Sequence, residues 1–272
     1  MSRILGRIAE AFAGHDGSQT AQRVAAIRAG FDRPTTPEGD GNAQRRLCAG
    51  MGAPARAPWL RPHLLARTRF FDDVTLAAIA RGVGQVVILG AGYDDRALRF
   101  RAPGVRFFEL DHAATQADKR RRLVGGGLRT DRLELIAADF GGHDEVGALL
   151  ARAGHDTERD TLFICEGLLV YLDEPAIVTL LTALAARASA ASTLAASLAI
   201  HPAELDPKSV AAAANARRRL GAREPWVTIL PLQAHLDLLH DAGWVEQTVA
   251  DDTALEPQAV PGRSLLVTAH PR

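Results

Sequence analysis

The sequence predicts an α/β fold in which a mostly parallel, seven-stranded sheet carries helices on both faces. From residue 85 onward, short apolar runs alternate with segments of helical spacing, which is typical of parallel strands joined by crossover helices. Glycines follow the first run directly and an acid ends the second, which is the layout of a nucleotide-type site. The last two runs, at 244–249 and 264–269, have no helix between them and predict an antiparallel pair at one edge of the sheet.

The first 80 residues predict a helical cap in front of the sheet. Apolar side chains recur at helical spacing over 1–32 and again over 63–80. Proline and glycine residues predict irregular chain between these helices, at 33–42 and 50–62. We therefore expect a cap at 1–80 that is followed by a separate sheet domain.

A single sheet domain is predicted for 81–272. Five strand-like runs precede the antiparallel pair, at 85–89, 105–110, 132–137, 161–166 and 193–199. Segments of helical spacing lie at 95–101, 112–124, 143–153, 174–188, 204–220 and 231–242. The segment 201–231 is predicted to form a lid over the site, because it lies beyond the tip of a strand.

The glycine turn after the first strand limits the kind of ligand. Gln85–Leu89 is a β-branched, apolar run that predicts a strand buried on both faces. Gly90 and Gly92 follow, where the chain must turn and leave room close to its backbone. A dinucleotide fingerprint has a third glycine where Asp95 stands, and together with Asp94 this acid disfavours a pyrophosphate. The turn favours a ligand with a ribose and no phosphate, such as S-adenosylmethionine, and a tight turn without a ligand is the alternative.

Acids also stand where other predicted strands end, which is where open parallel sheets bind ligands. Asp111 ends the second strand and suits the hydroxyl groups of a ribose. Asp139 and Phe140 follow the third strand and suit an adenine, although Asp139 alone is also a typical helix cap. Glu166 ends the fourth strand and suits the ammonium group of a methionine moiety, with a solvent-exposed acid as the alternative.

Composition and charge narrow the class of protein. Of 272 residues, 47% are hydrophobic and 24% charged, as in ordinary soluble globular proteins. The formal net charge is zero and no basic stripe is present, which argues against nucleic acid as a partner. No apolar run approaches the ~18 residues of a membrane span, and the N-terminus lacks the pattern of a signal peptide. Two cysteines form no disulfide framework, so we expect a cytoplasmic protein, and we predict no metal site.

These motifs resemble those of the leucine carboxyl methyltransferase-like family of S-adenosylmethionine-dependent methyltransferases, which includes O-methyltransferases of the tetracenomycin type. The matching segments lie at 20–29, 66–73, 89–96 (LGAGYDDR), 108–111, 138–140 and 165–172 (CEGLLVYL). They follow the family's order along nearly the whole chain. The resemblance implies the Rossmann-like fold of class I methyltransferases, with S-adenosyl-L-methionine as cofactor.

The resemblance also implies a cofactor site. Two arginines would hold the cofactor carboxylate, the glycine turn would lie beneath the methionine, and the strand-end acids would contact the ribose, adenine and amino group. In chain order, the implied cofactor-binding residues are Arg28, Arg67, Gly90, Ala91, Gly92, Asp111, Asp139, Phe140 and Glu166. The chain departs from the family pattern at Tyr93, where an aliphatic residue or Met is usual, and at Asp95, where a small hydroxyl residue is common.

Methyl transfer from a sulfonium is an in-line displacement, so the protein mainly aligns the nucleophile and excludes water. A carboxylate acceptor is ionised at neutral pH and needs no base, whereas a hydroxyl is helped by a base such as histidine. His201 and His63 are the candidates for that base, with a structural role as the alternative for each. Tyr171 and Trp226 are candidates for the wall of an acceptor pocket, with core packing as their alternative.

We therefore expect an S-adenosylmethionine-dependent O-methyltransferase that acts on a carboxylate or hydroxyl of a small molecule, such as a natural product. One alternative is an NAD(P)-dependent oxidoreductase, which the absent third glycine and the antiparallel ending disfavour. The other is a non-catalytic protein that binds an adenosyl ligand. The oligomeric state is not predicted.

Overall fold

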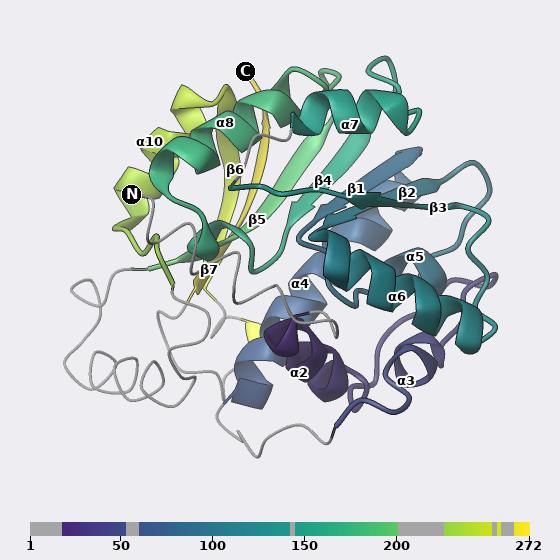
Figure 1. Cartoon of the computed structure of the whole chain (residues 1–272). Helices are drawn as coiled ribbons and strands as arrows, with labels where there is room; N and C mark the ends of the chain where they lie inside the picture. Colours follow the sequence, from purple (N-terminus) through teal and green to yellow (C-terminus); the bar gives the residue numbers. More distant parts are fainter. Residues whose placement is uncertain (1–17, 53–59, 142–144, 201–225, 252–254, 257–263) are drawn as a thin grey trace.

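The structure, a computed structural model, describes residues 18–52, 60–141, 145–200, 226–251, 255–256 and 264–272. Its described strands form a seven-stranded sheet in the order β3-β2-β1-β4-β5-β7-β6 (Figure 1). The strands are β1 (Gln85–Leu89), β2 (Arg106–Asp111), β3 (Leu133–Ala137), β4 (Thr161–Cys165), β5 (Thr193–Ala199), β6 (Trp244–Asp251) and β7 (Ser264–Pro271). Every strand begins and ends within two residues of its predicted run, so the predicted α/β fold is confirmed.

The described helices also follow the predicted order. Before the sheet come α2 (Gln19–Arg28), α3 (Ala43–Leu47) and α4 (Leu60–Ala80). Within the sheet domain come α5 (Arg96–Arg99), α6 (Ala113–Gly125), α7 (Val146–Arg152), the 3₁₀ helix η1 (Leu169–Tyr171), α8 (Glu174–Ala185) and α10 (Leu232–Asp241). The predicted helix at 204–220, and the predicted helical residues before 18, lie outside the described residues. Among the described helices, none has the length and apolar character that crossing a membrane requires.

β1 lies at the centre of the parallel part of the sheet. Val87 is paired with Phe108 of β2 on one side and with Phe163 of β4 on the other. All five residues of β1 are buried, as predicted for a strand that is covered on both faces. Because β1 to β5 run in the same direction, their carboxyl ends meet at one edge of the sheet.

Alternate residues of β1 pack into two apolar cores, because successive side chains of a strand point to opposite faces. Val87 and Leu89 belong to a core with side chains of α7, α8 and α10. Val86 and Ile88 belong to a second core with side chains of α4 and α5. Figure 1 shows the same division, with α7, α8 and α10 on one side of the sheet and α4, α5 and α6 on the other.

The two C-terminal strands are antiparallel, as predicted. β7 pairs with β5 as well as with β6, so β7 lies inside the sheet and β6 forms its edge. Leu266, Val267 and Ala269 of β7 are fully buried, whereas residues 247–249 of β6 are exposed. The more apolar strand therefore takes the interior position.

The cap region differs from its prediction in two details. α4 begins at Leu60, so it includes Pro62, which was expected in irregular chain. Proline is tolerated there because the first turn of a helix needs no amide donor. α3 was not predicted, since five residues are too few to show helical periodicity. Phe71 and Ala78 of α4 pack in the same core as Val86 of β1. The division of the chain into two domains at residue 80 stays a prediction.

His155 lies buried between the start of β4 and the chain after α8. Its Nδ1 accepts a hydrogen bond from Arg187 Nε at 3.2 Å, so the neutral ring carries its proton on Nε2 and donates to Thr161 Oγ1 at 3.0 Å. Burial, together with the Arg187 guanidinium, lowers the pKa of His155 from 6.5 to about 4.

We expect the protein to lose stability through His155 as the pH falls from 6.5 to about 4. In this range the unfolded chain binds a proton at His155 and the folded chain does not, so acid lowers the free energy of unfolding, by up to about 3 kcal/mol. Denaturant unfolding should show a shallower pH dependence for His155→Gln than for the wild type. His270→Gln, at an exposed position, is the control substitution. Parallel curves for wild type and His155→Gln would contradict this assignment.

Candidate functional site

The glycine turn after β1 is bonded to the carboxylate that ends β2. Asp111 Oδ2 accepts a hydrogen bond from the Gly92 amide at 2.6 Å, and Oδ1 accepts one from the His112 amide at 2.7 Å. Burial raises the pKa of Asp111, and these two amide donors oppose the rise. Each carboxylate oxygen has a second acceptor position, so Asp111 can also accept hydrogen bonds from hydroxyl groups of a ligand.

Two protein side chains lie directly against the turn. Gly90 and Gly92 have φ angles of +65° and +50°, which glycine adopts without strain. A Cβ on Gly92 would lie 2.9 Å from Ala21 Cβ of α2, and one on Gly90 would lie 3.1 Å from Leu168 Cδ1. The protein itself therefore occupies the space that a side chain at either glycine would need, and room for a ligand against the backbone of the turn stays a prediction.

Tyr93 joins the turn to α6 and α3 by hydrogen bonds. Its hydroxyl donates to Asp118 Oδ2 of α6 at 2.6 Å, and its carbonyl oxygen accepts from Gln44 Nε2 of α3 at 3.0 Å. Burial and the hydrogen bond to Asp118 raise the pKa of Tyr93. The departure from the family pattern at this position thus adds polar contacts to a buried site.

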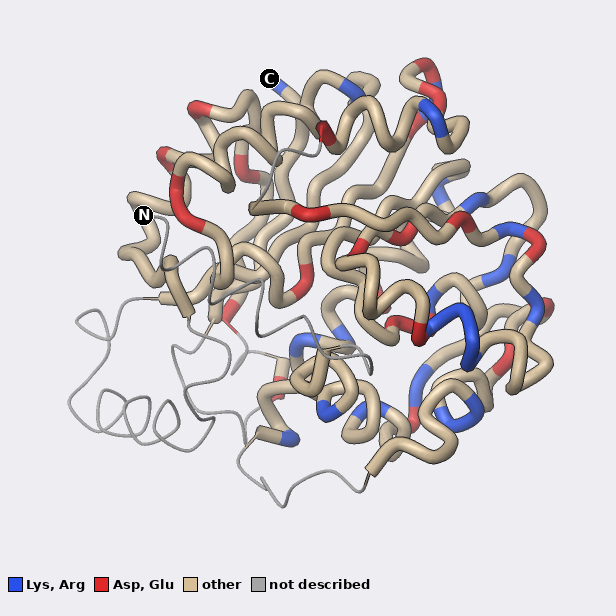
Figure 2. Tube along the Cα trace, viewed as in Figure 1, with Lys and Arg blue, Asp and Glu red and all other residues tan. Residues whose placement is uncertain are grey.

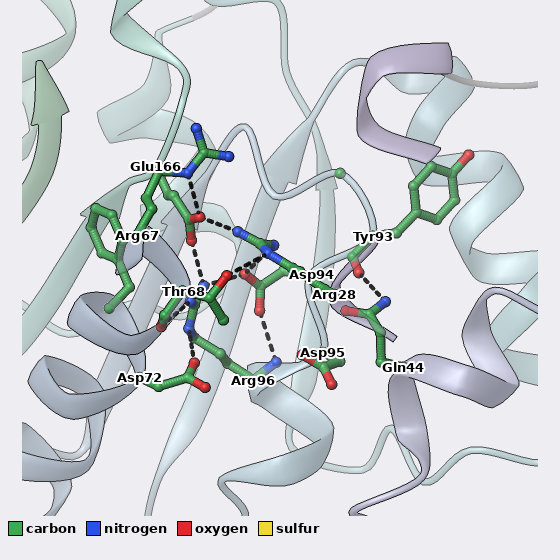
Figure 3. A network of polar contacts seen from close by, with 12 residues as sticks. Arg28, Gln44, Arg67, Thr68, Asp72, Tyr93, Asp94, Asp95, Arg96 and Glu166 are labelled. Atoms are coloured by element: carbon green, nitrogen blue, oxygen red, sulfur yellow. Dashed lines mark hydrogen bonds and ion pairs between the residues drawn. The ribbon is translucent and has the colours of Figure 1, made fainter. Parts of the chain in front are cut away.

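Three arginines surround the carboxylate of Glu166, directly after β4 (Figure 3). Oε1 is bonded to Arg28 Nη2 and, at 2.9 Å, to Arg67 Nε. Oε2 accepts from Arg96 Nη1 at 2.8 Å. Burial by itself would raise the pKa of Glu166, but the three guanidinium groups hold this pKa well below its usual range. The side chain is 4% exposed, so the alternative of a solvent-exposed acid is wrong.

Arg28 and Arg67, which were predicted at this site, are brought to it from separate helices. Arg28 is the last residue of α2, and its Nε also donates to Thr68 Oγ1 at 3.2 Å. Arg67 lies in the second turn of α4, and burial lowers its pKa while Glu166 opposes the change. Their shared partner in this structure is Glu166.

Arg96 is a residue of this site that the sequence interpretation missed. Its Nε donates to Asp72 Oδ1 at 2.8 Å and its Nη1 to Asp94 Oδ2 at 2.5 Å, in addition to the bond to Glu166. The side chain is 1% exposed. Arg96 ends the matched segment 89–96, so the motif contained it, but no spacing rule indicates which distant acids an arginine will meet.

The charges of Asp94 and Asp95 are compensated, which corrects the electrostatic argument against a pyrophosphate. Asp94 is paired with Arg96. Asp95 accepts from both terminal nitrogens of Arg33, at 2.9 and 2.7 Å, and from Arg99 Nε at 2.9 Å. Burial favours a raised pKa, but Arg99 and Arg33 lower the pKa of Asp95 to about 2. The absent third glycine and the antiparallel ending remain as the arguments against a dinucleotide.

The other predicted residues are Asp139, Phe140 and the two histidines. Asp139, just beyond β3, accepts from the Gly141 amide at 3.1 Å, and Phe140 is partly buried against the core. His63 is buried in α4, one turn before Arg67. The other histidine candidate, His201, and residues 201–225 of the predicted lid lie outside the described residues.

Two exposed apolar residues, Trp226 and Val227, lie beside η1, which begins three residues after Glu166. Trp226 and Val227 are 37% and 40% exposed, so the alternative of core packing is wrong for Trp226. The Val227 amide donates to the Val170 carbonyl at 2.8 Å, and Thr228 Oγ1 donates to the Leu172 carbonyl at 2.5 Å. Tyr171, within η1, is half-buried.

A cavity of about 330 Å³ lies elsewhere, near the beginnings of the strands. It is lined in part by Leu98, Arg101 and Leu128, which come from α5 and from the chains that lead into β2 and β3. It is therefore separate from the acids at the carboxyl ends, which remain the candidate site.

The strand order, with β7 antiparallel between β5 and β6, and the acids around the turn after β1 define a class I methyltransferase. A solved structure from Thermobifida fusca, titled as a putative methyltransferase, has the same fold with a TM-score of 0.62. It is 16% identical in sequence, and the match covers 93% of this chain and 94% of that one. At this identity the likeness shows the fold alone.

The family follows from the sequence comparisons. The model of the family described as Leucine carboxyl methyltransferase matches residues 6–185. The chain belongs to this family of S-adenosylmethionine-dependent methyltransferases. The resemblance inferred from the motifs is thereby confirmed.

Two relatives are named as putative S-adenosyl-L-methionine-dependent methyltransferases. The one from Frankia alni is 34% identical over 215 residues, which cover 78% of this chain and 71% of the relative. The one from Streptomyces avermitilis is 35% identical over 162 residues, which cover 59% of this chain and 53% of the relative. The match thus spans about half the length of the second relative.

Gly92→Ala is expected to lower the free energy of unfolding by about 1–2 kcal/mol, because alanine is strained at a positive φ. The contact of the added Cβ with Ala21 should cause an additional loss. Gly104→Ala is the matched control, since Gly104 has a φ of +76° and nothing within 4 Å of an added Cβ. Denaturant unfolding measures both losses. Ala21→Gly should remove the excess in the double variant, and equal losses for the two single variants would contradict the docking of α2 on the turn.

Proposed function

We propose that this chain transfers the methyl group of S-adenosylmethionine to an oxygen atom of a small molecule, either a carboxylate or a hydroxyl. The observation that carries this proposal is the order of polar groups along the sheet edge. Asp139 follows β3, Asp111 ends β2, the glycine turn follows β1 and Glu166 follows β4, in the neighbouring order β3-β2-β1-β4. Adenine, ribose and methionine follow one another in this order in the cofactor.

The residues beyond β4 fit the amino-acid end of the cofactor. An α-amino acid carries a carboxylate and an ammonium group, so it needs both cations and an anion. Arg28 and Arg67 supply guanidinium groups suited to a carboxylate, and Glu166 supplies a carboxylate that stays ionised. On the other side of the turn, Asp111 has acceptor capacity for ribose hydroxyls.

The chemistry asks little of the protein beyond alignment. When bound, the cofactor supplies an activated methyl group on its sulfonium. The chain then has to hold the acceptor oxygen in line and keep water away. A carboxylate acceptor needs no base, and for a hydroxyl acceptor His63 and His201 remain the proposed candidates.

We infer an apolar or aromatic acceptor, such as a natural product. Trp226 and Val227 support this inference, because they present apolar surface next to η1. The Val227–Val170 hydrogen bond joins them to a residue four positions after Glu166. Exposed Trp beside other apolar side chains is typical of ligand-binding surface. Both residues belong to the predicted lid at 201–231.

The remaining proposals concern partners, location and domain division. Basic residues of α6 lie beside acidic ones (Figure 2): the basic run 119–122 follows the single acid of the helix, Asp118, which pairs with Arg121 and Arg122. This mixed pattern supports a small-molecule substrate in preference to nucleic acid. A cytoplasmic location and a helical cap at 1–80 are proposed with it.

Calorimetry with S-adenosylhomocysteine and with NAD tests the proposed function. We expect S-adenosylhomocysteine to bind and NAD not to bind, and binding of NAD alone would overturn the proposal. Transfer of a labelled methyl group to a panel of aromatic acids and phenols then identifies the acceptor, because methyl esters are cleaved by base and methyl ethers are not. Cofactor binding without transfer to any acceptor would favour the non-catalytic alternative.

Asp111→Ala should weaken the binding of S-adenosylhomocysteine by roughly 1–3 kcal/mol, since it removes hydrogen bonds to a charged acceptor. Calorimetric dissociation constants measure the loss. Asp131→Ala is the control, because Asp131 is half-exposed and pairs with Arg101 away from the strand ends. Thermal unfolding is monitored in parallel, since Asp111 also binds two backbone amides. An unchanged dissociation constant would remove the ribose assignment.

A further inference from the structure

Arg96 joins three carboxylates that come from different parts of the chain (Figure 3). Its Nε donates to Asp72 of α4, and its Nη1 donates both to Asp94 in the turn and to Glu166 after β4. Its backbone amide donates to Asp94 as well, at 2.7 Å. With 1% of the side chain exposed, the position of the guanidinium is set by the surrounding protein.

Arg96 approaches Glu166 differently from the other two arginines. Arg28 and Arg67 bind Oε1, whereas Arg96 binds Oε2. A ligand carboxylate that binds Arg28 and Arg67 would compete with Oε1 for them. Arg96 is held by Asp72 and Asp94 at the same time, so its bond to Oε2 is independent of that competition.

We propose that Arg96 is a positioning residue that holds the carboxylate of Glu166 in place to receive the ammonium group of the cofactor's amino-acid end. This inference rests on the proposed function and adds to it the residue on which recognition of the amino-acid end depends. Arg96 acts through Glu166 and is not itself in contact with the reacting atoms.

The consequence of removing Arg96 is specific to one end of the cofactor. Without Arg96, Oε2 of Glu166 loses its donor and the carboxylate is free to turn toward Arg28 and Arg67. It then points away from the ammonium group and competes with the ligand carboxylate for these arginines. Asp111 is bonded to the amides of Gly92 and His112, so recognition of the nucleoside end is left intact.

Two ligands separate these ends. S-adenosylhomocysteine has both the nucleoside and the amino-acid part, whereas 5′-methylthioadenosine has the nucleoside and lacks the amino acid. The ratio of their dissociation constants, measured by calorimetry, reports the amino-acid end alone. We expect Arg96→Met to reduce the preference for S-adenosylhomocysteine roughly tenfold or more, the range for a lost hydrogen bond to a charged group, with little change for 5′-methylthioadenosine.

Arg99→Met is the matched control. Arg99 is also 1% exposed and also binds Asp72, but its other partners are Asp95 and the carbonyl of Pro34. Both variants remove a buried guanidinium from Asp72 and should lower the melting temperature. Only Arg96→Met should change the ligand preference, and an equal change in Arg99→Met would overturn the proposal.

Further variants keep the result interpretable. Should Arg96→Met fail to fold, Arg96→Lys keeps the charge but cannot reproduce the branched contacts, and it should also reduce the preference. Glu166→Gln should reduce the preference, and adding an Arg96 substitution to it should give no further loss.

The outcomes distinguish the two proposals. A reduced preference in Glu166→Gln with none in the Arg96 variants overturns the role of Arg96 and leaves the proposed function standing. Failure of the wild type to bind S-adenosylhomocysteine overturns the proposed function and this inference with it.

Discussion

A buried carboxylate at the end of β4 needs positive charge around it, and this requirement organises the carboxyl edge of the sheet. Glu166 is 4% exposed, and moving an unpaired carboxylate out of water is costly. The compensating guanidinium groups come from α2, α4 and the beginning of α5. Three helices that are separate in sequence are thereby drawn to one strand end, and the same groups form the proposed amino-acid subsite.

The attachment of α2 shows how strongly polar contacts shape this region. Ala25 and Arg28 are the buried residues of α2, and Val24 and Ile27 are partly buried against the cluster of Phe31, Leu60 and Leu64. Arg28 is bound to Glu166, and Ala21 lies so close to Gly92 that a Cβ at this position would force a shift. Arg28 is also proposed to bind the cofactor carboxylate. The same guanidinium group would therefore hold α2 in position and bind the cofactor.

Most of the fold was predictable because its signals are local. Gln85–Leu89 is apolar throughout since both faces of β1 are covered, and the glycines of the turn stand directly after it. The strand-end positions of Asp111 and Glu166 follow from the ends of the apolar runs. The place of β7 inside the sheet was not predictable, because pairing between distant strands leaves no local pattern in either strand.

The sequence by itself determined the alternation of strands and helices, the turn after β1 and the acids that end the strands, because each depends on neighbouring residues. Only the tertiary structure decided how the charges pair. It brought Arg96 to Glu166, placed arginines on Asp94 and Asp95, and set Ala21 against Gly92. The physical reason is that an ion pair depends on distance in space, which spacing along the chain does not specify when many arginines and acids are available.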